Sequence, residues 1–240
     1  MSDAVLNPQP NSLFDQMFRV GAHLGYSRTR RHPSTKPYIL GTKNNIEIID
    51  LDKISLQLEE AKAFVAELGR SNKPVLFVGT KPEIRKTIKQ TAESIGQPYV
   101  TERWVGGTLT NSSEIRKRVD RLVDFRLKEE KGELNVYTKR ERGVITKEME
   151  DLTHLFGGII SLKELPKALL VADSREESIA VAEAKRLGIP VVSLSNSDCD
   201  IHSINYPIVC NDANRASVTF FIEMLAEAYR IGRDNKTVEP

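Results

Sequence analysis

Several features that would narrow the function are scarce or absent in this sequence. Only two cysteines occur, Cys199 and Cys210, without a CxxC pair, so no disulfide framework or zinc motif is predicted. The four histidines stand singly, and we predict neither a metal site nor a cofactor. No run of eighteen apolar residues suggests a membrane span. Residues 1–11 are polar and proline-containing, unlike a secretory signal, so we expect a cytoplasmic protein.

Acidic residues are absent from one long stretch of the chain. The whole protein is nearly neutral, with 35 basic and 33 acidic residues and a net charge of +2, yet residues 16–46 contain no Asp or Glu. The cations of this basic segment include Arg28, Arg30, Arg31, Lys36 and Lys43. Arginine and lysine match phosphate groups in charge and geometry. The segment therefore predicts either a nucleic-acid contact or an ordinary solvated basic loop.

Short apolar runs alternate with amphipathic segments along most of the chain. Residues 75–78, 99–101, 168–172, 190–194 and 206–209 are typical of buried strands, and the segments between them have helical periodicity. This alternation predicts a three-layer, Rossmann- or flavodoxin-like α/β fold with a mostly parallel sheet. Two further β-like runs, 38–41 and 46–50, flank Asn44-Asn45 and predict a hairpin, while residues 26–37 are expected to form a loop.

Two glycine pairs, Gly106-Gly107 and Gly157-Gly158, bracket a segment that is typical of helix, turn and helix. We predict an inserted antiparallel, coiled-coil hairpin over residues 106–158, within a discontinuous α/β domain of residues 1–105 and 159–231. Residues 232–240 are predicted to form a polar tail. The single tryptophan, Trp104, is expected to pack where the hairpin joins the sheet, with stacking on a nucleic-acid base as the alternative.

Several polar residues are placed where helices are expected to begin. Thr138 with Glu141 has the spacing of a capping box, in which each side chain bonds the other's backbone amide. The other predicted helix starts are Asp52, Asn111 with Glu114, Ser174 with Glu177, and Asp212, and Gly69 is predicted to end the helix that follows Asp52.

Polar residues at the expected strand ends leave an enzymatic alternative open. Thr80, Asp173 and Asn196 could converge at one sheet edge, where α/β proteins place ligands. However, the chain has no GxxxxGK phosphate loop and no recognisable nucleophile–base arrangement. The alternatives are thus a small-molecule or nucleotide-binding α/β enzyme with its site at the strand C-termini, and a protein-interaction scaffold whose hairpin is a docking arm.

Several motifs resemble those of the bacterial ribosomal protein S2 family of the small subunit. The resemblance extends over about residues 13–232 and is strongest in the segment from Arg103 to Asn111. The main motifs are Gly21-Ala22-His23-Leu24-Gly25, Phe77-Val78-Gly79-Thr80-Lys81, Arg103-Trp104-Val105-Gly106-Gly107-Thr108-Leu109-Thr110-Asn111 and Gly188-Ile189-Pro190-Val191. The chain departs from the family at Asn196-Ser197-Asp198, Ile201, Cys210 and Arg31-His32-Pro33.

The resemblance implies a structural constituent of the small ribosomal subunit without catalytic activity. Its implied partners are 16S rRNA and neighbouring subunit proteins, including the large mRNA-binding protein, with no membrane and no small-molecule substrate. The residues expected to bind RNA are Arg28, Arg30, Arg31, Lys36, Lys43, Arg103, Arg116, Lys117, Arg121, Lys139 and Arg140.

Overall fold

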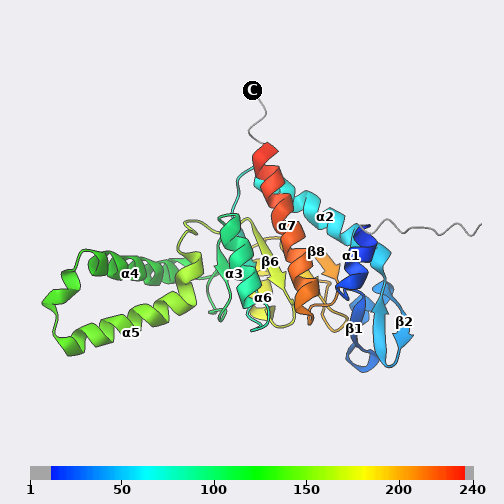
Figure 1. The fold of residues 1–240 in the computed structure, drawn as a ribbon, viewed down its shortest axis with the longest axis horizontal. Coiled ribbons are helices and arrows are strands. Elements are labelled where there is room, and N and C mark those ends of the chain that lie inside the picture. The colour runs from blue at the N-terminus through cyan, green and yellow to red at the C-terminus, as the bar shows by residue number, and fades with distance from the viewer. Residues whose placement is uncertain (1–11, 236–240) are drawn as a thin grey trace, which may run out of the picture.

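A computed structural model describes residues 12–235, which form two sheets and seven α-helices, two of which build a projecting arm (Figure 1). The order of the helices and strands is α1 (Leu13–Arg19), β1 (Leu24–Ser27), β2 (Ile39–Lys43), β3 (Ile46–Ile49), α2 (Leu51–Arg70), β4 (Val75–Val78), α3 (Arg85–Ser94), β5 (Tyr99–Val100), α4 (Ser112–Glu130), α5 (Lys139–Phe156), β6 (Ala168–Ala172), α6 (Ser178–Arg186), β7 (Val191–Ser195), β8 (Tyr206–Val209) and α7 (Arg215–Asn235). Short 3-10 turns lie at 28–30, 33–38, 133–136 and 157–159.

The larger sheet is parallel and separates two hydrophobic cores. Its strand order is β5-β4-β6-β7-β8. Successive side chains of a strand point to opposite faces: Val75 and Phe77 pack with α2, α3 and α7, whereas Leu76 and Val78 pack with α6 and the base of the arm. Because both faces are covered, the strands are continuously apolar. The predicted three-layer α/β fold with a mostly parallel sheet is confirmed.

The strand order reverses between β4 and β6. From β4 the chain passes outward to β5, and it returns through the arm to β6, which pairs with β4 from Val75↔Ala168 to Val78↔Val171. In parallel α/β sheets the carboxyl ends at such a reversal form a crevice. Thr80 and Asp173 follow these two strands, so the reversal places them close together.

The smaller sheet is antiparallel, with the order β1-β3-β2. The predicted hairpin is confirmed, and Asn44 and Asn45 at its turn have φ of 51° and 63°, the left-handed values that two-residue hairpin turns require. The expectation of a loop after residue 25 was wrong in part. The segment 24–27 forms β1 by pairing with β3, with Leu24 opposite Ile48, and this long-range pairing has no local signature.

Most of the predicted helix starts differ from the observed ones. The Thr138–Glu141 capping box is confirmed. Asp50, and not Asp52, caps α2, with its Oδ1 accepting from the backbone amide of Asp52 at 3.1 Å. Asn111 is the N-cap residue of α4, so the position of this start is confirmed. Its capping box is not, because the Asn111 side chain makes no cap bond and Glu114 pairs with Lys117 at 2.6 Å.

The last two predicted starts were also wrong, because their side chains have tertiary partners. Helix α6 begins only at Ser178, and Glu177 accepts a hydrogen bond from the Thr80 amide. Asp212 faces Asn196 and Lys81, while Asn214 accepts from the Ala216 amide at the start of α7.

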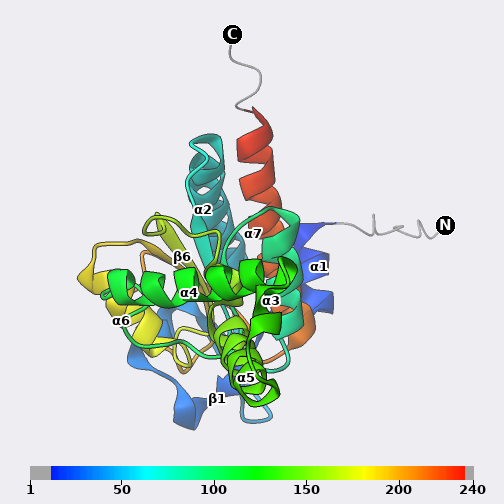
Figure 2. The ribbon, with the colours of Figure 1, turned by 90° about the vertical axis from the view of Figure 1, so that its left-hand side faces the viewer.

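The arm consists of α4 and α5, which lie antiparallel and extend away from the sheet (Figures 1 and 2). A narrow seam joins them, in which Ile115, Val119 and Leu122 of α4 are buried with Leu152 and Phe156 of α5. The division into domains at the stated boundaries stays a prediction. Helix α7 continues past the predicted start of the tail at residue 232, and residues 236–240, like 1–11, lie outside the described part.

Two glycines allow α2 and α7 to cross with their backbones in contact. A Cβ at Gly69 would lie 2.1 Å from the Tyr229 carbonyl oxygen, and one at Gly232 would lie 2.0 Å from that of Ala66. The expectation that Gly69 ends its helix was therefore wrong. The helix continues to Arg70, and Gly69 allows the backbones of α2 and α7 to approach each other closely.

The second glycine pair is also a packing site, which gives a test of the arm's attachment. A Cβ at Gly158 would lie 2.2 Å from the Tyr99 carbonyl oxygen on β5, whereas one at Gly106 meets nothing within 4 Å. We expect Gly158→Ala to lower the free energy of unfolding by about 1–3 kcal/mol, as overpacking does. Gly106→Ala is the matched control and should change it by less than about 0.5 kcal/mol. Urea unfolding measures both, and equal values would contradict a packed root.

Candidate nucleic-acid interface

The root of the arm is fixed to α6 by one buried carboxylate. Glu183 is 7% exposed, and its Oε1 accepts hydrogen bonds from Trp104 Nε1 at 3.1 Å and the Gly107 amide at 2.7 Å. Its Oε2 accepts from the Leu109 amide at 3.0 Å and from the amide and hydroxyl of Thr110, each at 3.1 Å. Charge-assisted bonds of this kind are about twice as strong as neutral ones.

These bonds determine the protonation state of Glu183 and the role of Trp104. Burial alone would raise the pKa of this carboxyl, but the hydrogen bonds from Thr110, Gly107, Trp104 and Leu109 outweigh it and lower the pKa. Trp104 is buried, 7% exposed, with its indole N–H satisfied. The prediction that it packs at the root is confirmed, and base stacking by this side chain is excluded.

The sheet edge brings together the polar residues of the enzymatic alternative. Lys81 forms ion pairs with Asp173 and, at 3.7 Å, with Asp212, whose other oxygen accepts from Asn196 Nδ2 at 2.9 Å. Burial and the nearby Asp173 charge raise the pKa of Asp212 to about 7, while Lys81 and Asn196 oppose this rise. Burial lowers the pKa of Lys81, but the two carboxylates outweigh it and raise that pKa.

The same cluster has the donor atoms of a cation site, and the Lys81 ammonium group pairs with its two carboxylates. Oxygens of Asp173 and Asp212 and the Cys199 sulfur lie within 4.8 Å of one another. Lys81 Nζ supplies positive charge to both carboxylates. Burial, with the Asp173 and Asp212 charges, raises the pKa of the Cys199 thiol to about 12, so this sulfur is protonated near neutral pH. Lys81 thus pairs with both carboxylates of the cluster.

The turn after β4 is an ordinary strand-to-helix turn and not a phosphate loop. The Thr80 amide donates to a carboxylate oxygen of Glu177 at 2.6 Å, so this potential anion site is filled by the protein itself. Burial raises the pKa of Glu177, and the Thr80 bonds partly offset the rise. A Cβ at Gly79 would lie 3.0 Å from Ile88 Cγ1, so this glycine serves packing against α3.

The basic segment is held against the sheet edge by the loop that follows β7. The Ser197 carbonyl oxygen accepts hydrogen bonds from the His32 amide and the Thr35 hydroxyl, both at 2.8 Å. The Ser197 hydroxyl accepts a hydrogen bond from the Tyr26 amide at 3.0 Å. Ser34 Oγ donates to the Cys199 carbonyl at 3.3 Å. The departure from the family at residues 196–198 therefore lies at the anchor of the segment that carries the predicted RNA-binding cations.

One cation of the segment has an internal role. Arg31 Nη1 lies 3.1 Å from Glu47 Oε1, and the Glu47 side chain is fully buried. Arg31 therefore has an acidic partner, although residues 16–46 contain no Asp or Glu. Glu47 lies on β3, beyond the acid-free residues, and reaches Arg31 only through the fold.

The eleven predicted RNA-binding residues divide into two groups. Within residues 12–235, those with an exposed side chain and no acidic partner are Arg28, Arg30, Lys36, Lys43, Arg103, Lys139 and Arg140. Arg30 also lies 5.5 Å from the Tyr26 ring centroid. The remaining four form ion pairs: Arg31 with Glu47, Arg116 with Asp120, Lys117 with Glu114, and Arg121 with Glu148. The first group lies at three places: the basic segment, the root of the arm and the start of α5.

Comparisons with known proteins identify the family. A model of the ribosomal protein S2 family matches residues 17–232. The chain belongs to this family. It is 41% identical over 217 residues to the "Small ribosomal subunit protein uS2" of Bdellovibrio bacteriovorus, covering 90% of this chain and 69% of that protein. The protein of the same name from a Roseiflexus species is 41% identical over 216 residues, with coverage of 90% and 82%. The predicted family is confirmed, and the enzymatic alternative finds no support.

Among residues 12–235, none of the helices combines the length and the apolar character that a transmembrane segment needs.

Glu183 gives a pH-dependent test of the arm's root. Glu183→Gln replaces an acceptor by an amide that faces N–H donors, so we expect the free energy of unfolding to fall by about 2–4 kcal/mol near pH 7. The pKa of Glu183 is lowered from its ordinary 4.5 in the folded state. Its charge therefore stabilises the fold above that pH, and the stabilisation is lost as pH falls through the folded pKa.

Unfolding by urea at pH 7, 5 and 3 measures this effect. The difference between wild type and Glu183→Gln should shrink on acidification. Glu60→Gln, at an exposed position of α2, is the control and should have little effect throughout. A difference that stays constant from pH 7 to pH 3 would contradict a charged anchor.

Proposed function

We propose that this protein is a structural, non-catalytic constituent of the small ribosomal subunit that binds 16S rRNA through its exposed cations. The observation that carries this proposal is the basic segment, in which Arg28, Lys36 and Lys43 are exposed and have no acidic partner among the described residues. Such cations are free to contact phosphates, and RNA binding by them would be sensitive to salt.

The segment presents its cations from an ordered backbone. His32, Ser34 and Thr35 are bonded to the loop after β7, and Arg31 is fixed by Glu47. A fixed segment loses less conformational entropy on binding than a free loop does. We infer that Arg31 positions the segment, while its exposed neighbours contact the RNA backbone.

The arm offers a second contact at its far end. Lys139 and Arg140 open α5 without acidic partners among residues 12–235, whereas Arg116, Lys117 and Arg121 on α4 are neutralised by neighbouring acids. An ion pair must be broken, or its acid brought near the phosphates, before such a cation binds RNA. We therefore propose that the arm contacts RNA mainly through the start of α5, and only to a lesser extent along α4. Arg103 is proposed as a further contact at the root of the arm.

The family supports further partners for this chain. Two relatives are named as proteins of the small ribosomal subunit. On that basis we propose that the protein works on cytoplasmic ribosomes, contacts neighbouring small-subunit proteins and helps to dock the large mRNA-binding protein.

Removing three unpaired cations tests the RNA contact. We expect the triple variant Arg28→Ala, Lys36→Ala and Lys43→Ala to bind less tightly to small subunits that lack this protein. Each lost phosphate contact reduces the slope of log K against log salt by about 0.7–0.9, so the slope should fall by about 2. Arg31 is left intact because its loss would leave Glu47 buried and unpaired.

The control is a triple variant of equal charge, Lys62→Ala, Arg70→Ala and Lys89→Ala, on α2 and α3. Lys62 and Arg70 pair with acids of their own helix at 2.8 and 2.7 Å, and Lys89 is exposed. Binding by this control should keep the wild-type salt slope. Equal slopes for wild type and the first variant would show that the basic segment does not bind RNA.

A further inference from the structure

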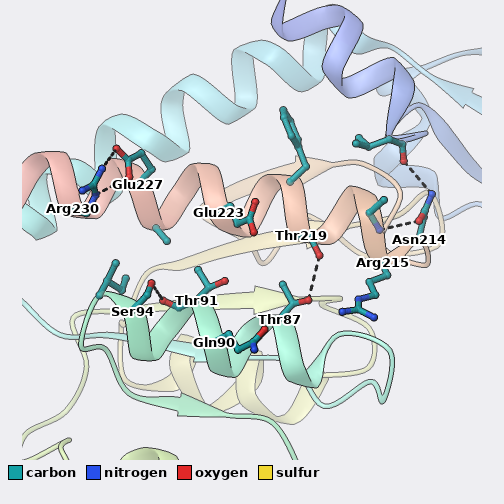
Figure 3. Close-up of a pocket in the computed structure, with 15 residues that line it drawn as sticks. Thr87, Gln90, Thr91, Ser94, Asn214, Arg215, Thr219, Glu223, Glu227 and Arg230 are labelled. Atoms are coloured by element: carbon teal, nitrogen blue, oxygen red, sulfur yellow. Dashed lines mark hydrogen bonds and ion pairs between the residues drawn. The ribbon is translucent and has the colours of Figure 1, made fainter. Parts of the chain in front are cut away.

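A long groove lies between α3 and α7, on the layer that covers one face of the parallel sheet (Figure 3). Its volume is about 1260 Å³. The side chains that line it on α7 extend from Arg215 to Arg230, which corresponds to about 22 Å at 1.5 Å per residue. None of the predicted RNA-binding residues lines the groove.

Several small side chains line the groove. Thr87 of α3 and Thr219 of α7 approach each other with their hydroxyls 3.3 Å apart, and Ala216 and Ala226 lie on the α7 side. Phe220 is partly exposed and adds an aromatic surface. An elongated groove beside two helices has the shape that a third helix can fill when its side chains pack between those of the other two.

The charges at the rim favour a protein over RNA. Figure 3 shows Arg215 near one end and the Glu227–Arg230 pair, at 2.7 Å, at the other. Glu223 lies between them, and neither it nor Arg215 has a charged partner among residues 12–235. The carboxylate of Glu223 would repel phosphates, and the pairing of Glu227 with Arg230 leaves no excess of positive charge.

We propose that this groove binds an amphipathic helix of a neighbouring small-subunit protein. That helix would place small apolar side chains against Ala216 and Phe220, a basic side chain opposite Glu223 and an acidic one opposite Arg215. The inference rests on the proposed function, because it takes the partner from the small ribosomal subunit.

Site-directed cross-linking tests this contact in the full-length protein. Gln90→Cys places a thiol on the exposed α3 rim, and because Cys199 and Cys210 are buried, a benzophenone maleimide will label the new cysteine selectively. The labelled protein is bound to small subunits that lack it, sedimented and irradiated, and the cross-linked peptide is identified by mass spectrometry. Glu60→Cys on the exposed side of α2, labelled in the same way, is the control.

The inference predicts that the label at position 90 cross-links to one segment of a neighbouring protein, and that this segment has the sequence pattern of an amphipathic helix. The label at position 60 should not cross-link to that segment. Adding Glu223→Lys should reduce its yield at least fivefold, and reversing the facing basic residue of the partner should restore it. Glu223 has no charged partner among residues 12–235, so this variant should fold, as circular dichroism will verify.

The remaining outcomes separate the two proposals. If the labelled protein sediments with small subunits but cross-links only to rRNA, or to no protein, the groove assignment is overturned and the proposed function stands. The groove assignment is overturned in the same way if Glu223→Lys leaves the protein cross-link unchanged. If the protein does not sediment with small subunits at all, the proposed function fails, and this inference fails with it.

Discussion

The carboxylate of Glu183 is the contact on which the arrangement of the molecule depends. It joins α6, which packs on the sheet, to the segment from Trp104 to Thr110, from which the arm departs. The loop's amides have no strand or helix partner, and a buried amide without an acceptor costs about 1–3 kcal/mol. One charged acceptor satisfies them together. The direction of the arm relative to the sheet, and thus the separation of its far cations from the basic segment, follows from this attachment.

Charged and polar groups with internal partners also line the crevice at the sheet edge. The crevice where strand order reverses usually offers free amides and charged groups to a ligand. In this protein the Thr80 amide already binds Glu177, and Lys81 lies between Asp173 and Asp212. Internal hydrogen bonds and ion pairs thus engage these polar groups of the crevice. The loop after β7 instead holds the basic segment through hydrogen bonds of Ser197. The sheet edge that binds ligands in other α/β proteins thus positions the basic segment in this protein.

The sequence predicted those features whose causes are local. Continuous apolar runs predicted the parallel strands, because these strands are buried on both faces of the sheet. Helical periodicity predicted the arm, because each of its helices buries one face. Strand β1 was missed, and helix starts were wrongly predicted at Ser174 with Glu177 and at Asp212, since the partners of these segments are distant in the chain. For the site, composition located the basic segment. It could not distinguish Arg31, which Glu47 neutralises across the fold, from its exposed neighbours.

This distinction between paired and unpaired cations separates two kinds of surface. An ion-paired cation on α4, such as Arg121 beside Glu148, presents nearly no net charge to an approaching phosphate, and salt screens what remains. An unpaired cation such as Lys36 presents its full charge, and binding releases counterions from the RNA. Because the net charge of the whole chain is only +2, we expect attraction to RNA to arise where the unpaired cations gather. The neutral remainder, including the α3–α7 groove, is left for contacts in which shape and local charge matching determine the partner.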